Sequence, residues 1–166
     1  YAKTRKQNVS NRVTIGDLEI DVTPARKLKG NTNFHTIYVS KLNTWKQTNI
    51  QTHINDISKS GRLNEIKLLK IWRELHNLDF PSIYLEYLIL EILYGRSTNP
   101  NNLEKNVEFV FERLSQETNN PMLYRIEDPS NSRNVLSNLL TKEKKQQVIS
   151  QAKKTIFAKY WDLVVW

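Results

Sequence analysis

The stretch that decides the fold is Leu18-Glu19-Ile20-Asp21-Val22-Thr23-Pro24-Ala25-Arg26, an alternating segment that stops at a proline. Side chains alternate between the two faces of a strand, so Leu18, Ile20 and Val22 share one face. Glu19, Asp21 and Thr23 share the other. The pattern predicts a strand whose apolar face packs on a core and whose Asp21 carboxylate points away from that core.

Both ends of this strand carry turn signals. Gly16-Asp17 precedes it and suits a two-residue hairpin turn from an earlier strand through Val13 and Ile15. Pro24 cannot donate to a strand ladder, and the basic residues that follow predict a cationic loop containing Arg26 and closed by Gly30-Asn31. A carboxylate beside a basic loop fits a metal and phosphate site, and a solvated surface ion pair fits the same residues.

Size and composition limit the function classes. The chain has 166 residues, enough for one ordinary core, and 25 Lys and Arg against 17 Asp and Glu give a formal net charge of +8. That charge indicates a polyanionic partner such as nucleoside triphosphates, RNA or DNA. Without cysteine, a thiolate metal site and a disulfide framework are excluded, and a cytoplasmic location is expected. No apolar run is long enough for a membrane span.

The remainder of the chain predicts one more strand and then helices. Residues 34–41 alternate as a strand, and Thr48 with Gln51 resembles a capping box for a helix that ends at Ser60-Gly61. That helix would bury Ile50, Ile54 and Ile57. His53 on it is expected to be a packing or hydrogen-bonding residue.

Four further helices complete the prediction. Leu63 to Leu78 should bury Leu68, Ile71, Trp72, Leu75 and Leu78 and carry Lys67 and Lys70 on its polar side. Two lysines three residues apart suit a phosphate-binding face, and a solvated helix face gives the same pattern. Ser82 can cap a nearly all-apolar helix that runs to Gly95. The next two helices should bury Val107, Val110, Phe111 and Leu114, and then Val148, Ile149, Ala152, Ile156, Tyr160 and Leu163.

Five segments, taken in order, resemble the second half of a template-independent nucleotidyltransferase. They are Ile20 to Ala25, Trp45 to Asn49 with His53, Leu68 to Trp72, Ser82 to Glu86, and Ile126 to Asn131 with Asn134. The family is that of oligoadenylate synthases, cyclic GMP-AMP synthase and the bacterial cyclic-oligonucleotide synthases (CD-NTases) of anti-phage defence, with the bacterial branch most similar. The similarity spans nearly the whole chain, and the order and spacing of the segments carry it.

The resemblance implies roles for three residues. Asp21 matches the third metal-binding acid, Lys70 the helical lysine that contacts the nucleoside triphosphate, and Ser82 a phosphate-contacting serine. In such enzymes two Mg²⁺ ions held by carboxylates activate the attacking hydroxyl and stabilise the leaving pyrophosphate. We add Lys67 and Arg26 as candidate phosphate-binding cations beside these three.

The sequence also departs from the family. The Gly-Ser loop and the Asp-x-Asp pair, which supply the other two acids, lie upstream of the third acid in relatives, and nothing before Asp21 matches them. Ile83 stands where relatives often place an aromatic that stacks on the base. The chain, which opens without an initiator methionine, is expected to be part of something longer and to be catalytically silent until the missing half completes it.

The fold class predicted is therefore α+β, with short antiparallel strands of a polymerase-beta-like sheet followed by a helical bundle. Residues 1–45 would hold the strands with the third acid, and residues 46–166 the helices. The function expected is synthesis of cyclic oligonucleotide second messengers from ribonucleoside triphosphates, such as ATP, with magnesium, in antiviral defence. Two alternatives stay open: an RNA- or tRNA-tailing nucleotidyltransferase, and an inactive module that binds nucleic acid or protein.

Overall fold

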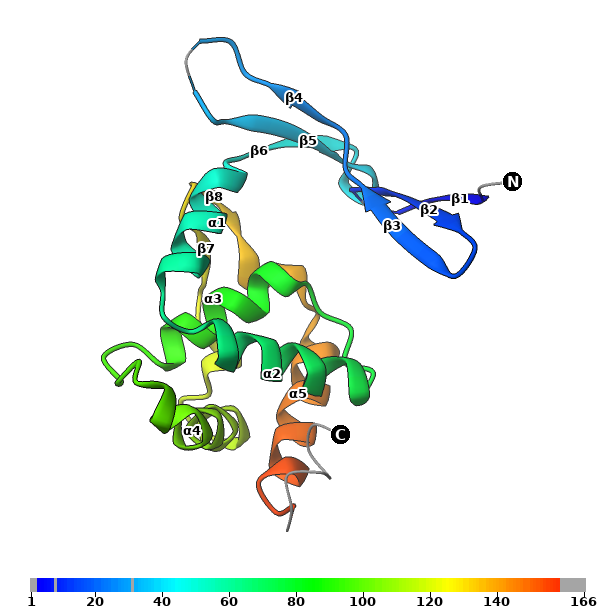
Figure 1. The fold of residues 1–166 in the computed structure, drawn as a ribbon. Coiled ribbons are helices and arrows are strands. Elements are labelled where there is room, and N and C mark those ends of the chain that lie inside the picture. Colours follow the sequence, from blue (N-terminus) through cyan, green and yellow to red (C-terminus); the bar gives the residue numbers. More distant parts are fainter. Residues whose placement is uncertain (1–2, 8, 31, 159–166) are drawn as a thin grey trace. The chain divides into compact units, whose positions relative to one another are not determined.

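The computed structural model describes residues 3–7, 9–30 and 32–158, and these form two compact units (Figure 1). Unit 1 comprises residues 1–54 and 129–134, and unit 2 comprises residues 55–128 and 135–166. Unit 1 holds most of the strands and unit 2 most of the helices, so the predicted α+β class is confirmed. None of the helices in this described part of the chain is both long and apolar enough to cross a bilayer.

Unit 1 contains two three-stranded antiparallel sheets. The first has the order β1-β2-β3, and the second has the order β4-β5-β6. Their bounds are β1 (Lys3–Lys6), β2 (Asn11–Ile15), β3 (Leu18–Val22), β4 (Ala25–Lys27), β5 (His35–Val39) and β6 (Thr44–Thr48).

The predicted hairpin turn at Gly16-Asp17 is present. Ile15 pairs with Leu18 across it, and Gly16 adopts the positive φ of 61° that such a turn requires. The expected burial of the apolar face of β3 is wrong, since Ile20 is 41% exposed and Leu18 59%. The predicted basic loop is also corrected: Arg26 lies on β4, because residues 25–27 pair with residues 35–37 of β5.

Unit 2 is a helical bundle around one core (Figure 1). Its helices are α1 (Ile50–Lys59), whose first turns belong to unit 1, α2 (Leu63–Leu75), α3 (Ser82–Ile92), α4 (Leu103–Ser115) and α5 (Lys142–Thr155). Short 3-10 turns of this unit lie at Pro100–Asn102, Pro121–Leu123 and Leu136–Leu139, and a further one, Ser40–Leu42, lies in unit 1. β7 (Glu127–Asp128) of unit 2 pairs as a hairpin with β8 (Asn131–Val135), whose residues 131–134 are assigned to unit 1. The fully buried side chains include Trp72, Tyr84, Leu85, Leu88, Val107, Val110, Leu114 and Val148.

Several helix predictions hold and several need correction. The inner face of α4 is buried as predicted. Helix α3 is mostly apolar and buries five residues in the core: Tyr84, Leu85, Leu88, Ile89 and Ile92. On α2 the predicted face is wrong in part: Ile66, Leu69 and Trp72 are buried, whereas Ile71 and Leu75 are 44% and 47% exposed.

The ends of the helices differ from the prediction as well. Asn49, not Thr48, caps α1, because its side-chain oxygen accepts the Thr52 amide at 3.2 Å while Thr48 ends β6. Ile50 and Ile54 of α1 are exposed. Pro81 is the N-cap of α3, so Ser82 does not cap it. Helix α5 begins after Thr141 as expected and ends at Thr155, leaving Ile156 exposed; Tyr160 and Leu163 lie outside the described residues.

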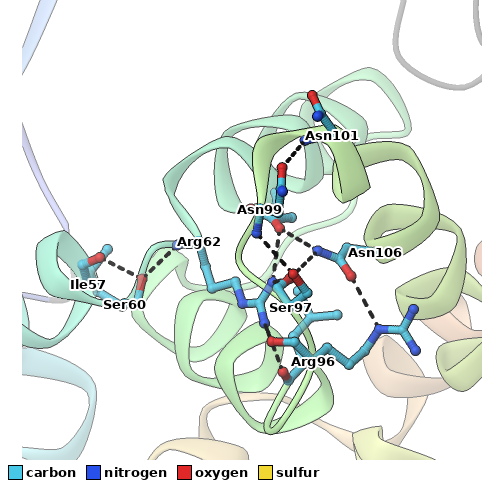
Figure 2. Close-up of polar contacts among 10 residues, drawn as sticks. Ile57, Ser60, Arg62, Arg96, Ser97, Asn99, Asn101 and Asn106 are labelled. Carbon is cyan, nitrogen blue, oxygen red and sulfur yellow. Dashed lines mark hydrogen bonds and ion pairs between the residues drawn. The ribbon is translucent and has the colours of Figure 1, made fainter.

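A buried polar network ties the start of α2 to the loop after α3 (Figure 2). Arg62 is 4% exposed, and its guanidinium donates to the Glu65 carboxylate at 3.2 Å and to the Leu93, Arg96 and Ser97 carbonyl oxygens. The Asn106 amide of α4 donates to the same Glu65 oxygen at 2.9 Å. The buried Glu65 carboxylate is thus paired with the Arg62 cation. The start of α2, the loop after α3 and helix α4 are joined by one set of hydrogen bonds.

Candidate functional site

Asp21 lies on β3 of unit 1, opposite Arg12 of β2. Both of its carboxylate oxygens accept from the Arg12 guanidinium, Oδ1 from Nε at 2.9 Å and Oδ2 from Nη2 at 3.1 Å. The Gln7 amide donates to Oδ1 at 3.1 Å, and Glu19, on the same face, accepts from Arg12 at 2.6 Å. A guanidinium between two carboxylates holds Asp21 in a fixed orientation on an exposed sheet face.

The hydrogen bonds from Arg12 lower the pKa of Asp21 below the usual aspartate range, and they raise the pKa of Arg12. Because the folded-state pKa is depressed, the stabilisation is present above the unfolded pKa and is lost as pH falls through the folded pKa. We expect NMR titration of the Asp21 side-chain carbonyl carbon to show this low pKa, and Arg12→Gln to raise it. An unchanged Asp21 titration in Arg12→Gln would show that the two hydrogen bonds from Arg12 to Asp21 are absent in solution.

The carboxylates of the described residues do not by themselves make a magnesium site. Among residues 3–7, 9–30 and 32–158 no group of three or more His, Asp and Glu side chains could hold a metal ion. Two carboxylates approach one another at β3, Glu19 and Asp21, and the Arg12 cation occupies the space between them. A metal-binding role for Asp21 therefore needs other acids and a shift of Arg12 away from its carboxylate.

A second group of polar side chains lies where α2 packs on α3 in unit 2. Lys70 of α2 forms an ion pair with Glu86 of α3, and one turn further along, Arg73 Nη1 donates to Ser82 Oγ at 3.0 Å. We call these four residues the α2–α3 seam. The two helices run antiparallel, so the step forward from Lys70 to Arg73 on α2 is matched by the step back from Glu86 to Ser82 on α3.

Arg73 is the most constrained cation of the seam. Its Nη1 also donates to the Phe80 carbonyl oxygen at 2.9 Å, its guanidinium lies 5.9 Å from the centre of the Phe80 ring, and its Nη2 pairs with Glu74. Its side chain is 13% exposed. An open hollow of about 440 Å³ lies beside it, lined by Arg73, Glu74 and residues 77–82. The seam thus presents a positioned guanidinium and a hydroxyl to an open space, an arrangement suited to binding an anion.

The structure brings some of the predicted site residues together. Lys70 and Ser82 share the α2–α3 seam, and Lys67 lies exposed one turn before Lys70 on α2. Asp21 and Arg26 belong to unit 1 and to its two different sheets. The metal and phosphate roles of all five residues stay predictions.

Sequence reasoning assigned no role to Arg12, Arg73 or Glu86. A signal for Arg12 was present: a two-residue turn at Gly16-Asp17 fixes the register, and counting back from Ile15 and Leu18 places Arg12 opposite Asp21. Arg73 lies one turn after Lys70, so the spacing on α2 pointed to it. Glu86 had no such signal, because its partner depends on how α3 packs against α2.

Comparison with solved structures decides the fold. One structure of CdnC from E. coli MS115-1, in complex with HORMA-deltaN, matches with a TM-score of 0.65 over 98% of this chain, at 20% sequence identity. Another, of CdnC with ATP, matches with a TM-score of 0.63 over 98% of this chain, also at 20% identity. The chain has the CD-NTase fold. It spans 61% and 62% of the lengths of those two CdnC chains.

The likeness to CdnC confirms the resemblance to CD-NTases in fold. No family model and no curated protein sequence matches the chain. At 20% identity the match carries the arrangement of the backbone, and the chemistry has to be argued from the side chains described above.

Proposed function

We propose that this chain is the C-terminal part of a CD-NTase-like nucleotidyltransferase that joins ribonucleoside triphosphates into cyclic oligonucleotide second messengers for antiviral defence. The observation that carries the proposal is the match to CdnC over 98% of the chain. Asp21 would be one of three acids around two Mg²⁺ ions, with the other two supplied by a segment that precedes Tyr1. The α2–α3 seam would bind the triphosphate through Lys70 and Ser82, with Lys67 as a further cation on α2. Arg26 of unit 1 stays a separate candidate phosphate-binding cation.

Two features of the described residues support this assignment. The seam offers the Arg73 guanidinium and the Ser82 hydroxyl beside an open hollow, which suits a phosphate group. One of the CdnC structures is a complex with ATP, and a nucleoside triphosphate is the ligand we propose here. We place the complete protein in the cytoplasm, where these triphosphates are made.

The test is nucleotide incorporation by the protein encoded by the complete gene. With radiolabelled ATP and GTP and magnesium, we expect cyclic products that resist phosphatase, and no product from the 166-residue chain alone. Products from the 166-residue chain would overturn the need for the missing half. Label transferred to added tRNA, with no free oligonucleotide, would replace the proposal by RNA tailing.

Lys70 provides a separate prediction on binding. Lys70→Ala should weaken ATP binding to the complete enzyme by about tenfold or more, because a charge-assisted hydrogen bond to phosphate contributes roughly 1.5–3 kcal/mol. Lys153→Ala is the matched control, since Lys153 of α5 also pairs with a glutamate, Glu117, at 3.0 Å. Calorimetry at two salt concentrations measures both. Equal affinities of the two variants at both salts would leave Lys70 as a structural partner of Glu86.

A further inference from the structure

The positive charge of the chain is concentrated in unit 1. This unit has ten Lys and Arg against three Asp and Glu, a formal net charge of +7 out of +8 for the whole chain. Unit 2 has 15 against 14, a net charge of +1. A compact strand-rich unit with this excess attracts polyanions, whatever the α2–α3 seam binds.

One face of the β4-β5-β6 sheet in unit 1 carries an aromatic pair with a cation over it. Tyr38 of β5 lies opposite Trp45 of β6, with their ring centres 5.4 Å apart. The Arg26 guanidinium of β4 lies 5.7 Å from the Trp45 ring centre. Trp45 is 55% exposed although it is the largest side chain on the sheet. Exposed aromatic surface gathered at one place, here Trp45 beside Tyr38, is typical of an interaction site.

The strand register places polar side chains on the same face. Thr36 pairs with both Arg26 and Gln47, so these three residues form a row beside the Tyr38–Trp45 pair. Gln47 is exposed, and its amide can donate and accept. The face therefore combines stacking surface, positive charge and hydrogen-bonding groups.

We propose that this face, defined by Arg26, Thr36, Tyr38, Trp45 and Gln47, binds single-stranded RNA. Unpaired bases would stack on Trp45 and Tyr38, Arg26 would pair with a phosphate beside the Trp45 ring, and Gln47 and Thr36 would contact ribose hydroxyls. Sheets that present aromatic side chains in a basic setting bind single strands in this way, because every base has a face to stack. The inference does not depend on the proposed enzymatic function.

The test is fluorescence anisotropy of a labelled oligouridylate of about 20 nucleotides with the 166-residue chain. Trp45→Ala should weaken binding by about fivefold or more, which is the loss of one stacked base, and Trp45→Phe should recover most of it. Tyr94→Ala removes an aromatic that is 89% exposed in unit 2 and should leave the affinity unchanged. Circular dichroism checks that each variant is folded.

A second pair of variants separates stacking from general attraction. Arg26 and Lys27 are neighbours on β4 and point to opposite faces, so both replacements by alanine remove one charge from the same exposed strand. We expect Arg26→Ala to weaken binding several-fold more than Lys27→Ala, at low and at moderate salt. Equal losses of affinity in the two variants would show that RNA binding depends on net charge alone, and this would overturn the proposal.

Other oligonucleotides complete the test. Tighter binding of the oligouridylate than of oligothymidylate and of duplex RNA is expected. Equal affinity for oligothymidylate would overturn the assignment to RNA, and tighter binding of the duplex would overturn single-strand binding. Self-association in sedimentation that Trp45→Ala abolishes, with no RNA binding, would assign the face to a second copy of the chain instead.

Discussion

Replacing Asp21 with asparagine in the complete enzyme is expected to lower the rate of nucleotide incorporation by about 100-fold or more. Asparagine keeps the shape of the side chain but removes the negative charge, and a loss of this size corresponds to roughly 2.7 kcal/mol in the barrier. The fold should persist, because every residue of β3 is exposed and Asp21 is held there by side-chain hydrogen bonds from Gln7 and Arg12. Product formation from labelled ATP measures the rate.

Glu19→Gln is the matched control for Asp21→Asn. Glu19 lies on the same strand and the same face, and it accepts from the same Arg12. Losing the charge of Glu19 should change the rate of nucleotide incorporation by less than about threefold, which is a change in the activation barrier well under ~1.4 kcal/mol. If Asp21→Asn retained more than about a tenth of the wild-type rate, or if both variants lost activity equally, Asp21 would be a partner of Arg12 and not a catalytic acid.

The largest effect on stability is expected at Arg62. Arg62→Leu should reduce the free energy of unfolding by about 3–5 kcal/mol, because it leaves the buried Glu65 carboxylate without its cation and three carbonyl oxygens without their donor. For a chain of this size that corresponds to a fall in Tm of roughly 6–20 °C. Urea and thermal unfolding, followed by circular dichroism, measure the change.

Arg125→Leu serves as the comparison for Arg62→Leu. Arg125 also pairs with a glutamate, Glu127 at 2.7 Å, but its side chain is 64% exposed. The loss in free energy of unfolding should stay below about 1 kcal/mol, because water solvates the Glu127 carboxylate that is left without its partner. Similar losses for the two variants would mean that the Arg62 network is open to water in solution.

Local patterns in the sequence were sufficient to predict three parts of the fold. The Gly16-Asp17 turn, the mostly apolar α3 and the inner face of α4 follow from periodicity and backbone preference, which act over a few residues. The order of the five segments pointed to the CD-NTase fold, and the likeness to CdnC bears that out. The register that sets Arg12 against Asp21 was also within reach, since a two-residue turn leaves a single pairing.

Only tertiary packing decided the rest. Helix α2 carries apolar residues around more than half of its circumference, so periodicity allowed two buried faces, and contact with α3 and α4 selected the one with Ile66 and Leu69. The same packing chose Glu86 for Lys70 and Ser82 for Arg73, because partners on different helices depend on how those helices cross. The exposure of β3 was also decided by packing. Alternating apolar and polar residues show which side chains of a strand share a face, but that face is buried only where another element covers it.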